Sequence, residues 1–175
     1  IYALMADMYM NSKNYQAAYE ALAAIDTPDT KMRSTMQYLR YQMGIDAFLR
    51  NNMQEAIKWM TIAGEAGLDI AQRQLGIMYL NGRIVAQDYK AARDWMLKAA
   101  KQNDHHAQHN LSIIYSQGIG VKANDDKALY WERKAADGGH PDAQFNLALW
   151  YEKGDILPQN QELANLWYLM AAENG

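Results

Sequence analysis

The chain has 175 residues with 17 basic and 20 acidic side chains, which gives a formal net charge of −3. Its length suits about one domain of ordinary size, and its charge argues against a protein that binds nucleic acid by neutralising phosphates. It contains no Cys, which excludes a disulfide framework, Cys-ligated zinc and thiolate catalysis. Abundant Ala, Tyr, Met and Trp, with few Pro, favour closely packed helices over strands.

The sequence contains no apolar run of the roughly 18 to 20 residues that a membrane-spanning helix needs. We expect a soluble segment, and both a cytoplasmic and a periplasmic or secreted location are compatible with it. Because the chain begins with Ile1 rather than Met, we also expect that the natural N-terminus is missing and that the segment comes from a longer chain.

Residues 1–66 are predicted to form two helical hairpins. The segments MADMYMNSKNYQAAYEAL at 5–22 and MGIDAFLRNNMQEAIKWMTIA at 43–63 both resemble the tetratricopeptide repeat, in which two helices are joined by a short turn. Between them, Asp26, Thr27, Pro28 and Asp29 form a turn that is followed by a helix start.

A repeat with a period of 36 residues begins at Ala56 and continues through residues 67–175. The period is clearest for Trp59, Trp95, Trp131 and Trp167, and it also relates three sets of other residues: Ala56, Ala92, Ala128 and Ala164; Leu75, Leu111 and Leu147; and Tyr79, Tyr115 and Tyr151. Repeats of this length indicate stacked supersecondary units. Each unit is predicted to contain two helices, because its apolar positions recur with the spacing of one helix face.

The boundaries of the second helix in each unit can also be predicted. Asp88, Asn124 and Asn160 precede it and are good N-cap residues. Gly67, Asn103, Gly139 and Gly175 follow it and suit the left-handed conformation that commonly ends a helix. In the first helix, the small residue after the repeated Leu, such as Gly76, is predicted to face the repeated Ala, such as Ala92, so that the two backbones approach closely.

These positions resemble the Sel1-like repeat, a relative of the tetratricopeptide repeat. The resemblance covers AQRQLGIMYLNGRIVAQDYKAARDWMLKAA at 71–100, AQHNLSIIYSQGIGVKANDDKALYWERKAADGG at 107–139 and AQFNLALWYEKGDILPQNQELANLWYLMAAENG at 143–175. It implies an all-α, right-handed superhelical solenoid of five hairpins, with tetratricopeptide-like hairpins at 1–66 and three Sel1-like repeats at 67–175. The interval from Gly44 to Trp59 is four residues shorter than that from Gly76 to Trp95, so the second hairpin is expected to have a shorter loop.

The resemblance also implies a scaffold or adaptor that binds a protein or peptide on a concave face lined by the first helices of the units. Proteins that this chain resembles are mostly bacterial. The residues predicted to lie on the concave face are four amides, the side chains beside them and those one turn away: Gln42, Gln74, Asn110, Asn146, Tyr41, Arg73, His109, Phe145, Tyr38 and His106. A row of amide side chains can donate hydrogen bonds to an extended peptide backbone and accept hydrogen bonds from it, so it can bind peptides of many different sequences. Alternatively, Asn110 and Asn146 tie neighbouring helices together and contact no ligand.

No arrangement predicts catalysis, a cofactor or a metal. His105 and His109 lie four residues apart, but neither a third ligand nor the Glu of a zinc protease motif accompanies them. Asp125 and Asp126 begin a helix, where their charge is favourable.

Two alternative functions remain open from the sequence. The first is a binder or hydrolase of small molecules or cell-wall glycans that uses Tyr38, Tyr41 and Phe145 as stacking surfaces. The second is a spacer that stacks end to end through an uncapped last helix containing Leu166 and Met170.

Overall fold

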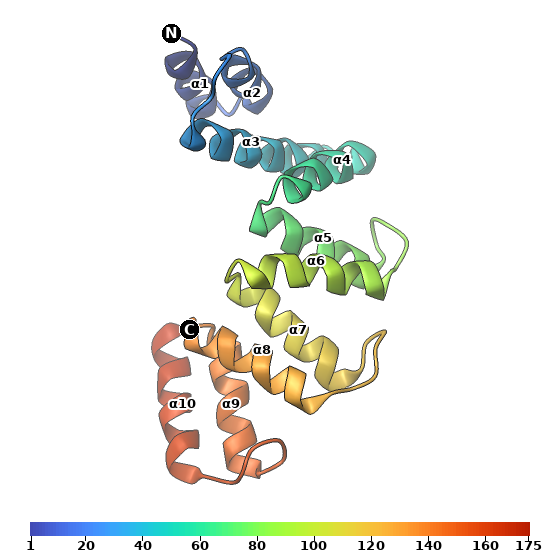
Figure 1. Ribbon diagram of the computed structural model, residues 1–175, viewed down its shortest axis with the longest axis vertical. Helices are drawn as coiled ribbons and strands as arrows, with labels where there is room; N and C mark the ends of the chain where they lie inside the picture. Colours follow the sequence, from blue (N-terminus) through green and yellow to red (C-terminus); the bar gives the residue numbers. More distant parts are fainter. The chain divides into compact units, whose positions relative to one another are not determined.

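The computed structural model describes residues 1–175 and contains ten α-helices and no strand. Consecutive helices pair as five helical hairpins, which confirms the all-α prediction (Figure 1). The helices are α1 Tyr2–Asn11, α2 Tyr15–Ala23, α3 Thr30–Leu49, α4 Met53–Glu65, α5 Asp69–Asn81, α6 Tyr89–Lys101, α7 His105–Gln117, α8 Asp125–Asp137, α9 Pro141–Lys153 and α10 Gln161–Asn174.

The chain divides into two compact units, Ile1–Leu75 and Gly76–Gly175, and the boundary falls within α5. None of the helices combines the length and the apolar character that crossing a bilayer requires.

Side-chain caps determine where the second helices begin. The side chains of Asp88, Asn124 and Asn160 accept hydrogen bonds of 2.8 to 3.0 Å from backbone N–H groups three residues later. Each bond satisfies a donor that the first turn of a helix leaves without an intrahelical acceptor. The three predicted N-caps are therefore confirmed.

Three of the four left-handed residues predicted after the second helices are also confirmed. Gly67, Asn103 and Gly139 have φ angles of +99°, +66° and +87°. Asn is one of the few side chains that adopts this region readily, which explains why it stands in place of Gly at one of these positions.

The shorter loop predicted for the second hairpin is present. Three residues, 50–52, connect α3 to α4, whereas seven residues, 82–88, connect α5 to α6. Two further connections, 118–124 and 154–160, have the same length as 82–88.

Small residues form much of the core in both units. In the first unit, Ala6, Ala18 and Leu39 share one buried cluster. In the second unit, the repeated Ala92 and Ala128 are fully buried. Gly76 allows close packing as predicted, but against Met96 rather than Ala92: a Cβ atom at Gly76 would lie 2.8 Å from the Met96 Cγ atom. The thioether side chain of Met96 fills the space that the absent Cβ leaves.

A buried Gln joins successive hairpins within each unit. The Nε2 atoms of Gln72, Gln108 and Gln144 donate to the backbone carbonyls of Gly64, Ala100 and Ala136 at 2.8, 3.0 and 3.0 Å. Each accepting carbonyl belongs to the last turn of the preceding helix, where intrahelical donors run out. Sequence reasoning missed these bonds, although the Ala-Gln dipeptides at 71–72, 107–108 and 143–144 recur with the 36-residue period.

Candidate partner-binding faces

In the first unit, the two predicted Tyr anchors differ in exposure. Tyr38 is 48% exposed on α3, whereas Tyr41 is only 7% exposed and packs in a cluster with Ala63 and Ala71. Burial raises the pKa of the Tyr41 hydroxyl, although the positive charge of Arg73 opposes this effect. The prediction that Tyr41 lies on an open surface is therefore wrong, because its ring is used for packing.

The other three predicted residues of the first unit, Gln42, Arg73 and Gln74, are half-buried. They lie on the first helices α3 and α5, as the repeat pattern predicted. Tyr38 is thus the most exposed of the predicted side chains in this unit.

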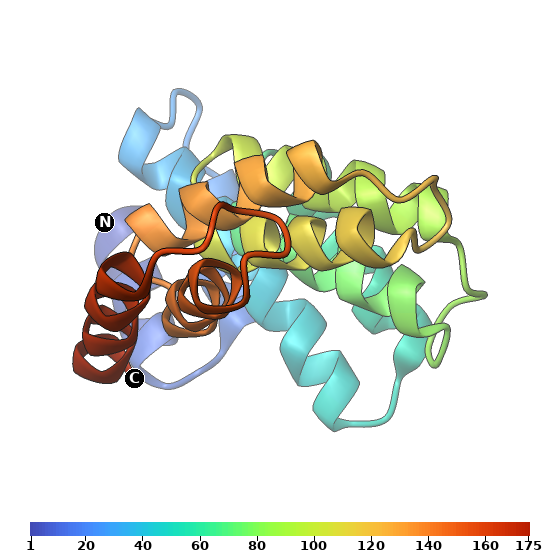
Figure 2. The same ribbon diagram turned by 90° about the horizontal axis from the view of Figure 1, so that it is seen from below.

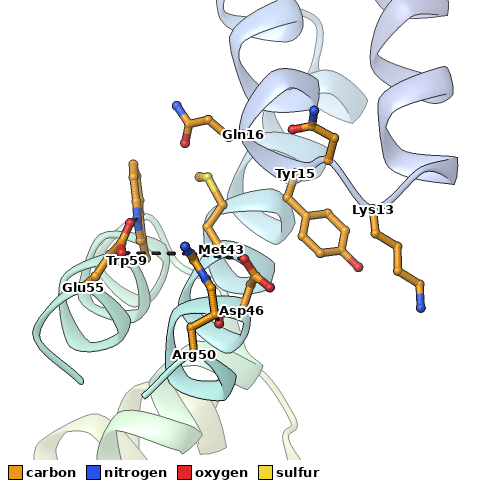
Figure 3. A pocket seen from close by; sticks show the side chains of 9 residues that line it. Lys13, Tyr15, Gln16, Met43, Asp46, Arg50, Glu55 and Trp59 are labelled. Atoms are coloured by element: carbon orange, nitrogen blue, oxygen red, sulfur yellow. Dashed lines mark hydrogen bonds and ion pairs between the residues drawn. The ribbon is translucent and has the colours of Figure 1, made fainter. Parts of the chain in front are cut away.

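The first unit also contains a cavity of about 390 Å³ that sequence reasoning did not predict (Figure 3). Its lining residues come from the α1–α2 turn, from α2, α3 and α4, and from the α3–α4 connection: Lys13, Asn14, Tyr15, Gln16, Met43, Asp46, Arg50, Glu55 and Trp59. The Arg50 guanidinium lies 3.1 Å from Asp46 and 4.0 Å from Glu55, and the Trp59 indole N–H donates to Glu55 at 3.4 Å. The cavity thus combines aromatic side chains with charged groups that pair with one another.

In the second unit, the dominant polar feature is a buried carboxylate. Glu132 on α8 is fully buried and accepts hydrogen bonds from the Asn146 amide at 2.6 Å and from the His109 Nδ1 atom at 3.1 Å. Asn146 therefore ties α9 to α8, which was the alternative to ligand binding in the sequence analysis. A buried charge is tolerated only when hydrogen bonds and an opposite charge compensate it, and these two partners supply both.

His109 is the counter-ion of this carboxylate. Burial alone would lower the pKa of His109, but the hydrogen bond and negative charge of Glu132, helped by Asp142, outweigh burial and raise it. The raised pKa favours the protonated imidazole, whose side chain is 14% exposed, beside a carboxylate whose side chain is 1% exposed.

His140 lies between His109 and His106 and is held near its neutral form. Its Nδ1 atom caps α9 by accepting from the Ala143 N–H at 3.4 Å, and its Nε2 atom lies 2.9 Å from the His106 Nδ1 atom. Its ring stacks on His109 with centroids 4.7 Å apart. Burial lowers the pKa of His140, and the charges of His109 and His106 lower it further.

This network was missed because it departs from the repeat. Met60, Met96 and Tyr168 occupy the positions that correspond to Glu132 at intervals of 36 residues. Asn110 corresponds to Asn146 in the preceding repeat, and Met96 corresponds to Glu132 there. Because Met96 has no carboxylate, Asn110 lacks this partner, and it makes no hydrogen bond to another side chain of the protein. The signal in the sequence was one Glu at a position where two other repeats have Met.

The remaining predicted residues of the second unit are open to solvent to different degrees. His106 is exposed, Asn110 is half-buried and Phe145 is 48% exposed. His105 directs its Nδ1 atom at Gln108 on its own helix, at 3.0 Å. The structure contains no group of three or more His, Asp or Glu side chains arranged to hold a metal ion.

Comparison with known proteins identifies the repeat. The family model described as "Sel1 repeat" matches residues 39–68, 69–104, 105–140 and 141–175. It thus includes residues 39–66, which were predicted to be tetratricopeptide-like, and it leaves residues 1–38 unmatched. No curated protein sequence matches significantly.

Solved structures show the same fold. The chain is similar to a Sel1 repeat protein from Oxalobacter formigenes, with 29% identity, a TM-score of 0.77 and coverage of 97% of this chain and 69% of that one. It is also similar to c5321, a protective antigen of uropathogenic Escherichia coli strains with an SLR fold, with 32% identity and a TM-score of 0.76. In that comparison 90% of this chain covers 33% of the antigen, so the chain spans about one third of its length.

The immunity protein Pa5087 from Pseudomonas aeruginosa shares the fold at 15% identity, with a TM-score of 0.55 and coverage of 99% of this chain and 74% of that one. Proteins with Sel1 repeats are generally helical scaffolds for protein interactions. Four matched repeats cover most of the sequence, and the chain therefore belongs to the Sel1 repeat family.

Proposed function

We propose that this protein is a non-catalytic scaffold that binds a protein or peptide partner through the exposed side chains of its first helices in the second unit. The observation that carries the proposal is Phe145, a large aromatic side chain that is 48% exposed on α9. Exposed aromatic side chains are enriched in protein interfaces, where they supply much of the binding energy.

Asn110 on α7 supports the same proposal. Its counterpart Asn146 is occupied by Glu132, whereas the Asn110 amide has no side-chain partner. A half-buried amide with free donors and an acceptor suits hydrogen bonding to the backbone of a bound segment.

The experiment is affinity capture from the cells that produce the protein, with bound proteins identified by mass spectrometry. The variant Asn110→Ala with Phe145→Ala is expected to lose the partner while helix content and thermal unfolding stay near those of the parent protein. Asn146→Ala is unsuitable for this purpose because it would leave the buried Glu132 with one donor fewer. A matched control is Tyr130→Ala, which removes a ring that is 53% exposed on α8. Equal capture by all three proteins would contradict the proposal.

A second candidate is binding of a small polar ligand such as a glycan fragment, and the cavity beside Trp59 favours it. Its volume of about 390 Å³ lies within the range of ligand pockets. Trp59 and Tyr15 offer aromatic surfaces, and Gln16 and Arg50 offer hydrogen bonds (Figure 3). Titration calorimetry with a panel of soluble glycans should give a heat signal that Trp59→Ala abolishes, and a silent titration would exclude this candidate.

A further inference from the structure

One face of α9 carries a stripe of side chains that remain at least partly exposed to solvent. Asp142, Phe145, Leu149 and Glu152 follow one another at spacings of three and four residues, so they line one side of the helix. Asp142 and Phe145 are exposed, and Leu149 and Glu152 are partly exposed. We call these four residues, together with Tyr168 of α10, the α9 stripe.

Tyr168 connects the middle of the stripe to its end. Helices α9 and α10 lie side by side in both views (Figures 1 and 2), and the rings of Phe145 and Tyr168 meet at a centroid distance of 5.3 Å and an interplanar angle of 60°. The Tyr168 hydroxyl donates to the Glu152 carboxylate at 2.8 Å, which orients that carboxylate beside the aromatic pair. This hydrogen bond raises the pKa of the Tyr168 hydroxyl, because it favours the protonated phenol.

Asp142 acts electrostatically on the nearby His109 and His140 rings, but the carboxylates of the stripe have no permanently charged partner. Neither Asp142 nor Glu152 forms an ion pair with a Lys or Arg side chain. Residues 141–175 contain five carboxylate side chains and a single basic one, Lys153. Acidic groups beside exposed aromatic rings attract cations, because the face of an aromatic ring is itself electronegative.

We propose that the α9 stripe binds an extended partner segment in which two basic side chains flank an apolar one. This inference rests on the proposed scaffold function and specifies the chemistry of the partner. The basic side chains pair with Asp142 and Glu152, and the apolar side chain lies on Phe145 and Tyr168. Arg suits these sites better than Lys, because its planar guanidinium both stacks on aromatic rings and pairs with carboxylates through two hydrogen bonds.

The spacing of the stripe predicts the spacing in the partner. Asp142 and Glu152 are ten residues apart, which corresponds to about 15 Å along a helix. An extended chain advances about 3.3 Å per residue, so basic side chains four or five residues apart reach both carboxylates. An apolar residue midway between them then lies over the aromatic pair.

The test uses three fluorescein-labelled seven-residue peptides that share a central Leu and Ser spacers. At the second and sixth positions, one peptide carries Arg, one carries Gln and one carries Glu. Fluorescence anisotropy with the full chain at low salt should show at least about tenfold tighter binding of the Arg peptide than of the Gln peptide, and no binding of the Glu peptide. Asp142→Asn and Glu152→Gln should each weaken binding of the Arg peptide several-fold, and Phe145→Ala should weaken all peptides that bind.

Matched controls separate the stripe from net charge and from fold. Asp126→Asn removes one exposed carboxylate at the start of α8, and Tyr130→Ala removes one exposed ring; neither should change binding of the Arg peptide. The inference would be overturned if the Arg and Gln peptides bound equally, or if Asp142→Asn and Glu152→Gln left binding of the Arg peptide unchanged. Either result would leave the proposed scaffold function intact. Absence of binding by all three peptides would also overturn it, whereas the scaffold proposal is decided by capture of the natural partner.

Discussion

At the scale of single residues, Glu132 determines the chemistry of the junction between the third and fourth matched repeats. It stands where two other repeats have Met, and it is fully buried. Its charge is compensated by His109 and Asn146, which come from two neighbouring helices. Sequence alone does not show which groups compensate this carboxylate, because His109 and Asn146 reach it only through the packing of α7 and α9 on α8.

We predict that His109→Phe destabilises the second unit by about 3 kcal/mol, because it leaves a buried carboxylate without its counter-ion. Adding Glu132→Met restores the residue of the other repeats and should recover most of this loss. Urea unfolding of the two single variants and the double variant measures the coupling. Additive effects of the two substitutions would show that the pair does not interact energetically.

The same cluster predicts how stability depends on pH. The pKa of His140 is lowered on folding, so its contribution is complete above the ordinary value of 6.5 and is lost as pH falls below that value. The pKa of His109 is raised, so its contribution is complete below 6.5 and is lost as pH rises through its folded pKa. The groups that face these rings are His106, Asp142 and Glu132. We therefore expect the free energy of unfolding to be highest near pH 6.5.

Urea unfolding at intervals between pH 5.5 and 8.5 checks this expectation, since other carboxylates contribute little in that range. His140→Asn keeps a capping side chain and should remove the loss on the acidic side, whereas His109→Phe should remove the loss on the alkaline side. A stability that is flat over this range in the parent protein would refute the assignment of these two shifts.

At the scale of helices and loops, the sequence predicted what depends on local chemistry. The N-caps Asp88, Asn124 and Asn160 and the left-handed residues after the second helices are short-range features that a few neighbouring residues decide. Contacts between hairpins were harder to predict. Tyr41 was expected on a surface because it lies beside the predicted binding residue Gln42, yet its packing against Ala63 and Ala71 buries it.

The bonds from Gln to a backbone carbonyl are also contacts between hairpins, and they lead to a further prediction. Gln144→Leu keeps the volume of the side chain but removes its hydrogen bonds to the Ala136 carbonyl and from the Asn174 amide, and leaves that carbonyl with the Gly139 N–H alone. We therefore expect a loss of about 1 kcal/mol in unfolding free energy. Gln161→Leu on the exposed start of α10 is the control and should change stability by less than about 0.5 kcal/mol. Chemical denaturation of both variants makes the comparison, and equal effects would show that the buried bond is not stabilising.

At the scale of the whole molecule, a 36-residue period is sufficient to predict the architecture but not the partner. In repeat proteins each unit contacts mainly its neighbours, so the residues that recur once per unit are those that packing requires. Trp95 and Trp131 are of this kind. Function must therefore be sought in residues that break the period, such as Phe145 where another repeat has Arg73.

The central claim is that a partner contacts the exposed side chains on the first helices of the second unit. It is tested most directly by placing a photo-crosslinking benzoylphenylalanine at position 145 and, in a separate protein, at position 130. Irradiation in the producing cells should link a discrete partner protein at position 145 and not at position 130, although both sites are exposed aromatic positions in the same unit. A partner linked at position 130 alone, or none at position 145, would contradict the account.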